Sequence, residues 1–216
     1  MILSRIEAYR SRDGGYSLAQ GSTSGNPYGC FLAVGAYEDL GSEPPNPSGL
    51  LLCLNAAARE DGSWTNLAPA ADHAFGSSSA HGSTLATGAA VAVLERLTGL
   101  QTASGDHCPA FDLGRTGNWL LKMADPRGGF LAGPLAPVSD LLSTAVAVHT
   151  LALLGVSFRH LRDNLLGFVY SLWDERGGFL GYWGDQQPDP EYTFYALMVL
   201  GHLARYFATA GPASKD

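Results

Sequence analysis

Hydrophobic residues recur at helical spacing in eight segments of the chain, and two kinds of segment alternate. Segments of the first kind are amphipathic, whereas segments of the second kind are apolar on nearly every side. A helix that is apolar all round is a buried one, so we expect the second kind to lie inside the fold and the first kind outside. The amphipathic segments are 3–10, 50–59, 116–123 and 161–173, and the apolar segments are 28–40, 83–97, 140–154 and 191–206.

A short glycine–aromatic phrase separates each amphipathic segment from the apolar segment that follows it. The four copies are Asp13-Gly14-Gly15-Tyr16, Asp61-Gly62-Ser63-Trp64, Arg127-Gly128-Gly129-Phe130 and Arg176-Gly177-Gly178-Phe179. The aromatic residues follow one another at intervals of 48, 66 and 49 residues. An interval near 48 suits a helical hairpin repeat. The longer middle interval indicates an insertion, which we place in the polar stretch 101–112.

The glycines in and after these segments predict where the chain turns. Glycine permits a sharp reversal in the phrase, where the aromatic ring is expected to wedge between neighbouring hairpins. Three apolar segments stop at Leu40-Gly41, Thr98-Gly99 and Leu154-Gly155, because glycine adopts the left-handed conformation that ends a helix. The pattern predicts an all-α fold of about four helical hairpin repeats, with no sheet, as a single domain over residues 1–216.

Composition and charge narrow the range of binding partners that we expect. Hydrophobic residues make up 46% of the chain and charged residues only 15%, which excludes intrinsic disorder. The formal net charge is −7, and 13 Lys and Arg are spread along the whole chain. A nucleic-acid binder needs clustered basic residues, so nucleic acid is not an expected partner.

The sequence also indicates the cellular compartment in which we expect the protein. The longest apolar runs are shorter than the roughly 20 residues that a membrane span needs. The N-terminal stretch 1–12 has charged residues and no apolar core, unlike a secretory signal. Three cysteines form neither an even framework nor a Cys-x-x-Cys pair. We therefore expect a reduced, cytoplasmic, soluble protein without a membrane span.

The last repeat carries a family resemblance. Residues 177–184, Gly-Gly-Phe-Leu-Gly-Tyr-Trp-Gly, and residues 189–197, Asp-Pro-Glu-Tyr-Thr-Phe-Tyr-Ala-Leu, resemble the repeat of protein prenyltransferase β subunits and terpenoid cyclases. Gly128-Gly129-Phe130 followed by 139–145 has the same order. The resemblance implies an α/α toroid in which inner helices surround an apolar central cavity.

The chain supplies fewer hairpins than that family usually has. It is therefore a small closed ring, an open arc, or a partial ring completed by a partner. An open arc exposes apolar inner-helix surface, and large exposed apolar patches mark interfaces. This interpretation favours a homo-oligomer.

The resemblance to protein prenyltransferases implies a zinc site, but this sequence lacks its ligands. That family binds zinc with an Asp-x-Cys pair at one inner-helix start and a His at another. The matching places here hold Asp140-Leu141-Leu142 and Tyr192, so we expect no metal and no other cofactor. An Asp-x-Cys does occur at Asp106-His107-Cys108, but it precedes an outer helix.

The resemblance to class II cyclases fits better. Those enzymes carry Asp-x-Asp-Asp-Thr at an inner-helix start, and the middle Asp protonates an alkene or epoxide. Here the matching residues are Asp189-Pro190-Glu191-Tyr192-Thr193, so Asp189 resembles the first acid and Glu191 the proton donor. Tyr192 replaces the third acid. In general, a carboxylic acid beside a carboxylate in an apolar cavity keeps its proton and is able to donate it.

Other residues at the inner-helix starts are candidates for the cavity mouth. His81 is a candidate catalytic base or hydrogen-bond partner, in addition to Asp189 and Glu191. Aromatic faces stabilise carbocations. The candidate substrate-binding residues are Asp140, Tyr28, Tyr182, Trp183, Tyr192 and Tyr195. The alternative interpretation is structural: Asp140 and Asp189 as helix N-caps, and the aromatic rings as core.

Two functions therefore remain open. One is an enzyme that acts on an apolar, isoprenoid or polyene substrate in the toroid cavity by carboxylic-acid protonation. The other is a noncatalytic relative that has lost the zinc site and binds an apolar ligand or a partner protein. Retention of Asp189 and Glu191 favours the first, and the incomplete acid motif favours the second.

Overall fold

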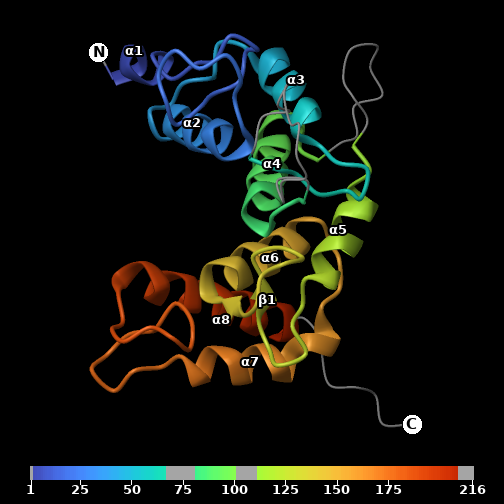
Figure 1. Ribbon diagram of the computed structural model, residues 1–216, viewed down its shortest axis with the longest axis vertical. Helices are drawn as coiled ribbons and strands as arrows, with labels where there is room; N and C mark the ends of the chain where they lie inside the picture. The colour runs from blue at the N-terminus through green and yellow to red at the C-terminus, as the bar shows by residue number, and fades with distance from the viewer. Residues whose placement is uncertain (1, 67–80, 101–110, 209–216) are drawn as a thin grey trace. The chain divides into compact units, whose positions relative to one another are not determined.

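The computed structural model describes residues 2–66, 81–100 and 111–208 (Figure 1). Its contacts divide the chain into two compact units, Met1–Trp119 and Leu120–Asp216, and each unit is described by itself. The expectation of a single domain over 1–216 stays a prediction. In the described part of the chain, no helix combines the length and hydropathy that crossing a bilayer requires.

The eight predicted helices are all present. They are α1 (Ile2–Glu7), α2 (Pro27–Asp39), α3 (Pro47–Ala57), α4 (Thr84–Thr98), α5 (Leu113–Lys122), α6 (Leu141–Leu153), α7 (Arg162–Ser171) and α8 (Pro190–Ala208). A 3₁₀ turn, η2 (Arg159–Leu161), leads into α7. The predicted inner positions are confirmed by burial, since residues 86–94 of α4 are all buried. Helix α4 packs along α2, and α8 packs along α6.

The expectation that the fold contains no sheet is wrong in one place. Strand β1 (Phe130–Leu131) pairs with β2 (Ser139–Asp140) in antiparallel register, with Phe130 opposite Asp140. The pairing arises because the aromatic residue of the phrase hydrogen-bonds through its backbone to the residue that caps the next inner helix. Isolated bridges join the aromatic residue of the phrase to a residue just past the end of the preceding outer helix in every repeat, for example Phe179 to Trp173.

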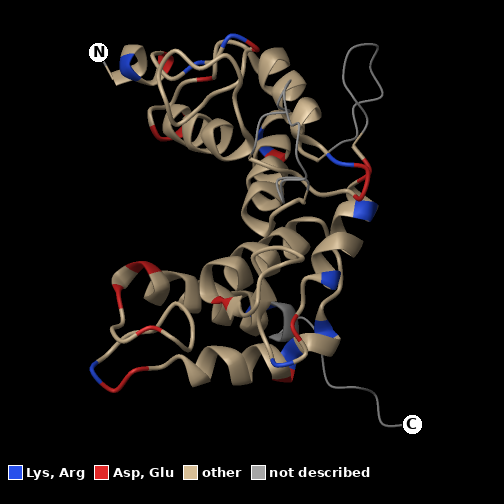
Figure 2. Cartoon of the chain, viewed as in Figure 1, with Lys and Arg blue, Asp and Glu red and all other residues tan. Residues whose placement is uncertain are grey.

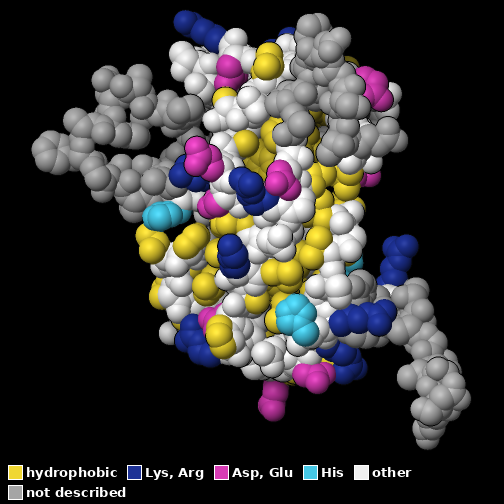
Figure 3. All heavy atoms as spheres, turned by 90° about the vertical axis from the view of Figure 1, so that its right-hand side faces the viewer, with side chains coloured by type: hydrophobic (Ala, Val, Ile, Leu, Met, Phe, Trp, Pro, Cys, Tyr) yellow, Lys and Arg dark blue, Asp and Glu magenta, His cyan; other side chains and the backbone are white. Residues whose placement is uncertain are grey.

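Charged residues lie mainly in loops and near helix ends, and α6 carries none (Figure 2). Apolar side chains reach the surface between scattered charges (Figure 3), in keeping with the low charged fraction. The predicted helix stops are confirmed: Gly41, Gly99 and Gly155 have φ of 61°, 61° and 65°. Glycine adopts this left-handed conformation without steric cost.

The start of each inner helix is held by the same set of hydrogen bonds, which we call the clamp. A polar N-cap side chain accepts from the backbone N–H three residues further on, which satisfies one of the free donors of the first turn. The N-caps are Asn26, Ser83, Asp140 and Asp189. Three of them also donate their own backbone N–H to the carbonyl of the phrase aromatic: Asn26 to Tyr16, Ser83 to Trp64 and Asp189 to Phe179.

The phrase aromatic completes the clamp with its own backbone N–H. This group donates to the side chain four residues past the N-cap: Tyr16 to Cys30 Sγ at 3.4 Å, Trp64 to Thr87 at 3.1 Å, Phe130 to Thr144 at 2.9 Å and Phe179 to Thr193 at 3.1 Å. All four aromatic side chains are buried. The phrase thus places a bulky apolar side chain in the core while its backbone fixes the helix start.

Four residues past the N-cap, the first inner helix has Cys30, whereas the other three inner helices have threonine. Its thiol lies 3.8 Å from the thiol of Cys53 on α3, and both side chains are buried. The hydrogen bond with Cys53 lowers the pKa of Cys30 and raises that of Cys53.

In the last two repeats an ion pair closes the phrase. Arg127 contacts Asp125 at 2.7 Å and donates to the Pro137 carbonyl, and Arg176 does the same with Asp174 and the Gln186 carbonyl. The hydrogen bond from Arg176 lowers the pKa of Asp174 to about 2. Each arginine ties its turn to the loop that leads to the next inner helix.

The clamp yields a stability prediction. Thr144→Val keeps the side-chain shape but leaves the buried Phe130 N–H without its acceptor, so the free energy of unfolding should fall by about 1–3 kcal/mol. The matched control is Thr150→Val on the same helix. Thr150 is equally buried, but its hydroxyl only donates to the carbonyl of Val146, so the change should cost much less. Urea unfolding measures both, and equal losses would contradict the clamp's role.

A histidine pair joins α6 to α8. His149 Nδ1 and His202 Nε2 are 2.9 Å apart, with the rings tilted at 56°. Burial lowers the pKa of His202, and the charges of His149 and Arg205 lower it further. The folded protein therefore favours the neutral imidazole at position 202.

This depressed pKa predicts a pH dependence. Below about 6.5, the ordinary value for histidine, the unfolded chain takes up a proton at position 202 before the folded chain does. The free energy of unfolding should therefore be highest above pH 6.5 and fall as the pH drops toward 5.5. Urea unfolding at several pH values measures the slope. His202→Gln should flatten it, whereas the exposed control His160→Gln should not; an unchanged slope in His202→Gln would contradict the assignment.

Candidate functional site

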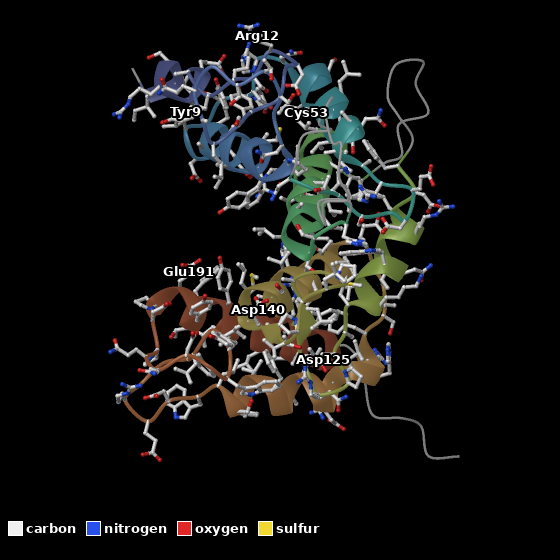
Figure 4. All side chains as sticks on the ribbon, viewed as in Figure 1. Tyr9, Arg12, Cys53, Asp125, Asp140 and Glu191 are labelled. Carbon is white, nitrogen blue, oxygen red and sulfur yellow. The ribbon has the colours of Figure 1, made fainter. Side chains whose placement is uncertain are left out.

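The two predicted acids lie at the start of α8, Asp189 just before the helix and Glu191 in its first turn, and Figure 4 labels Glu191. Asp189 is the N-cap: its Oδ1 accepts the backbone N–H of Tyr192 at 2.9 Å, and its carbonyl accepts the hydroxyl of Thr193 at 2.8 Å. Glu191 is exposed, and its Oε1 accepts the hydroxyl of Tyr195 at 3.2 Å. One acid therefore holds the helix start, and the other leaves its carboxylate accessible.

Asp140 occupies the same place at the start of α6. Its Oδ1 accepts the backbone N–H of Ser143 at 2.7 Å, and its Oδ2 accepts the hydroxyl of Ser143 at 2.7 Å. Both carboxylate oxygens thus have a capping partner. The structural interpretation of Asp140 and Asp189 as N-caps is confirmed by these bonds.

Tyr192 lies among several carboxylates. Burial raises the pKa of its phenol, and the charges of Asp185, Asp189, Glu191 and Asp140 raise it further. The ring packs on Gly181 so closely that a Cβ there would lie 2.4 Å from the ring. The carbonyl of Gly181 accepts the backbone N–H of Leu141 at 2.7 Å, which ties this loop to α6. The structure thus brings Asp140, Asp189, Glu191 and Tyr192 into one neighbourhood.

The remaining predicted rings of the second unit divide into two groups. Tyr195 lies 6.5 Å from Tyr192 between ring centroids, on the acid side. The indole N–H of Trp183 donates to Ser171 at 2.8 Å, and its ring packs edge-on against Phe168, so it contacts the outer helix α7. The guanidinium of Arg127 also lies 5.9 Å from the centre of its ring. Tyr182 is exposed next to Trp183.

Tyr28 and His81 belong to the first unit and are described only within it. Tyr28 is in the first turn of α2, where its backbone N–H donates to Asn66 Oδ1 at 3.1 Å and its ring stacks on Phe31. His81 is exposed and lies two residues before the N-cap Ser83. Neither residue is placed with Glu191 by the structure.

Sequence reasoning missed Asp185. Its Oδ2 accepts the backbone N–H groups of Gly181 at 2.9 Å and Tyr182 at 3.3 Å, and its charge faces Tyr192. The signal was present, because an Asp after a glycine in a polar loop often accepts from nearby backbone N–H groups. Asp185 therefore shapes the loop that carries Tyr182 and Trp183.

The residues at the family's zinc positions do not fit a zinc ion. Both oxygens of Asp140 are used in the cap, and Leu142 and Tyr192 supply neither a thiolate nor an imidazole. Among residues 2–66, 81–100 and 111–208, no three His, Cys, Asp or Glu side chains gather as a metal site would require. The Asp-x-Cys at 106–108 lies outside the described residues.

The first unit contains an apolar groove between α1 and α2. Its volume is about 370 Å³, in the range of small ligand pockets. Its lining residues are Ile2, Arg5, Ile6, Tyr9, Tyr16, Ser17, Leu18, Gly29, Leu32, Ala33 and Ala36. Behind it, Glu7 accepts hydrogen bonds from the hydroxyls of Tyr16 and Tyr37, which holds α1 against α2.

Comparison with known proteins decides the family. Residues 96–210, more than half of the chain, match the model of the prenyltransferase alpha-alpha toroid domain. The chain belongs to this family. The fold class predicted from the repeats, an all-α toroid of helical hairpins, is thereby confirmed. No curated protein sequence matches the chain.

Two solved structures illustrate the relationship. Protein geranylgeranyltransferase-I of Candida albicans, complexed with GGPP, aligns over 90% of this chain and 52% of its own, with TM-score 0.60 and 18% identity. The type II terpene cyclase MstE from Scytonema aligns over 96% of this chain and 67% of its own, with TM-score 0.58 and 14% identity.

At these identities the likeness concerns the fold. The chain spans about half the length of the geranylgeranyltransferase chain and about two thirds of the cyclase chain. Another cyclase structure contains an Asp-to-Asn variant with geranylgeranyl dihydroxybenzoate as substrate, at 14% identity and TM-score 0.58 over 96% of this chain and 66% of its own.

Proposed function

We propose that this toroid protein is an enzyme that protonates an apolar isoprenoid or polyene substrate, with Glu191 as the proton donor. The observation that carries the proposal is a comparison within the chain. The four inner-helix starts use their N-cap residues in the clamp, but Glu191 takes no part in it. The equivalent positions, two residues past the other N-caps, hold Tyr28, Leu85 and Leu142. An acid at this place has no counterpart in the repeat.

The surrounding residues suit such a role. Asp189 holds the first turn and so fixes the backbone that carries Glu191. The hydroxyl of Tyr195 donates to the Glu191 carboxylate and orients it. When the acid form gives its proton to an alkene or epoxide, a carbocation develops on the substrate. The rings of Tyr192 and Tyr195, 6.5 Å apart between centroids, support the proposal, because aromatic faces stabilise carbocations.

The proposed substrate class is supported by two similar solved structures, one complexed with GGPP and the other with geranylgeranyl dihydroxybenzoate. Both ligands are isoprenoids with internal alkenes. Isoprenoid polyenes and their epoxides are therefore the first compounds to screen.

A second candidate function is supported by the caps. Because Asp140 and Asp189 both serve the helix starts, their retention requires no catalysis. A noncatalytic member of the family would keep them and would bind an apolar ligand or a partner protein instead. The two candidates differ in what loss of Glu191 does.

Glu191→Gln tests the donor. Glutamine keeps the shape and accepts from Tyr195, but it has no acidic proton, so turnover should fall by about 10²- to 10⁴-fold. The matched control is Glu175→Gln, an exposed acid in the turn after α7. Product formation is measured by mass spectrometry on the substrate found in the screen, at equal thermal stability. Wild-type turnover by Glu191→Gln would overturn the assignment, and His81 would be tested next.

Asp189→Asn separates the cap from the charge. Asparagine caps α2 at Asn26, so this variant should lose no more than about 1 kcal/mol in free energy of unfolding. Asp189→Ala should lose about 0.5–2 kcal/mol because the cap itself is removed. If the Asp189 carboxylate also assists proton donation by Glu191, Asp189→Asn should reduce turnover, though less than Glu191→Gln does. Full turnover in the asparagine variant would restrict Asp189 to capping.

A further inference from the structure

The inner helices meet through two different stripes of side chains. At the joint of α6 and α8, His149, nine residues past its N-cap, meets His202, thirteen past its N-cap. At the joint of α2 and α4, Glu38, twelve past its N-cap, pairs with Arg96, thirteen past its N-cap, at 2.5 Å. In both joints the contacting residue of the later helix lies 13 residues past its N-cap, and that of the earlier helix lies 9 or 12 residues past its N-cap.

Residues three and four apart share one helix face, so each of these positions extends into a stripe. The later helix of a joint contributes positions 3, 6, 7, 10 and 13 past its N-cap, and we call this set its "following stripe". The earlier helix contributes positions 5, 8, 9 and 12, and we call this set its "preceding stripe". In α4 the following stripe is buried from Ala86 to Val93, and in α6 the preceding stripe is buried at Ala145 and Val148.

The same stripes have no inner helix packed on them at the two ends of the described hairpins. The following stripe of α2 consists of Gly29, Leu32, Ala33 and Ala36, and these residues line the apolar groove of the first unit. Gly29 and Ala33 are buried at the bottom of the groove, Ala36 is half-buried, and Leu32 is 45% exposed. The preceding stripe of α8 begins with Phe194 and Leu197, which are each 60% exposed, and continues to the exposed Gly201.

We infer that the preceding stripe of α8 docks into the α1–α2 groove of a second copy of this chain. The two surfaces are the halves of the joint that the chain already forms between its own neighbouring hairpins. Small residues, Gly29, Ala33 and Ala36, line the groove, and the large side chains Phe194 and Leu197 project from the ridge, so the ridge has space to enter. Their charges match as well. At the end where Glu38 meets Arg96, α2 carries Asp39, and α8 carries Arg205 one turn beyond Gly201.

The contact joins two different surfaces, so it is heterologous. Each added copy leaves one groove and one ridge free, and assembly continues until a ring closes or a filament forms. Blocking either surface therefore stops assembly. Two chains that are blocked on different surfaces still offer one intact groove and one intact ridge, and together they form a single 1:1 contact.

The experiment uses Leu32→Lys to block the groove and Leu197→Lys to block the ridge. The controls are Leu52→Lys and Leu135→Lys, which place the same charge at exposed leucines outside both stripes. Analytical ultracentrifugation of the 216-residue chain should show an oligomer for wild type and both controls, and a monomer for each blocked variant. An equimolar mixture of Leu32→Lys and Leu197→Lys should sediment as a dimer. Circular dichroism confirms that every variant keeps its helices.

Three results would overturn the inference. Wild type could remain monomeric at its highest soluble concentration. Only one blocked variant could dissociate, which indicates a symmetric contact through one stripe. The mixture could stay monomeric. Native mass spectrometry adds a fourth, because a monomer that carries an apolar small molecule would show that the groove is occupied by a ligand instead.

Discussion

The structure depends on one repeated interaction, the clamp between a buried aromatic residue and the start of an inner helix. A helix start leaves backbone N–H groups without partners, and in a buried helix these groups are costly unless a neighbour satisfies them. Here the N-cap side chain satisfies one, and the aromatic residue of the phrase pairs with the N-cap backbone. The phrase aromatic in turn gives its own N–H to the helix. Hairpin, turn and inner helix are therefore stabilised as a unit.

Because of this constraint, different residues at the candidate site hold the helix starts and remain available for chemistry. The aspartates that attract attention in a motif comparison are the ones that the clamp needs, and Asp140 has no carboxylate oxygen left over. The side chain two residues past the N-cap makes no bond of the clamp in any of the four repeats, so it is able to vary without loss of the clamp. Glu191 stands at that position, with Tyr195 and Tyr192 beside it. A fold maintained by repeated capping can in this way carry different activities or none.

Much of the fold could be predicted because it rests on local signals. Apolar periodicity located all eight helices, and glycines located their ends. The β1–β2 pairing could not be predicted, since two-residue strands leave no alternation to detect. The site was harder for a different reason. An Asp at a helix start is a cap or an acid depending on which bonds it makes. Likewise, Trp183 contacts the outer helix α7 through a hydrogen bond to Ser171, which no spacing indicates.

Cys30 gives the first hairpin a character of its own. Sulfur is a weak hydrogen-bond acceptor, so the clamp that fastens Tyr16 is weaker than those built on threonine. The order in which backbone amides exchange with deuterium should follow from this, with the Tyr16 amide opening before that of Phe130. Local opening there would also uncover the thiols of Cys30 and Cys53 to alkylating reagents. The hairpin that carries the groove would then be open to chemical modification at these two thiols.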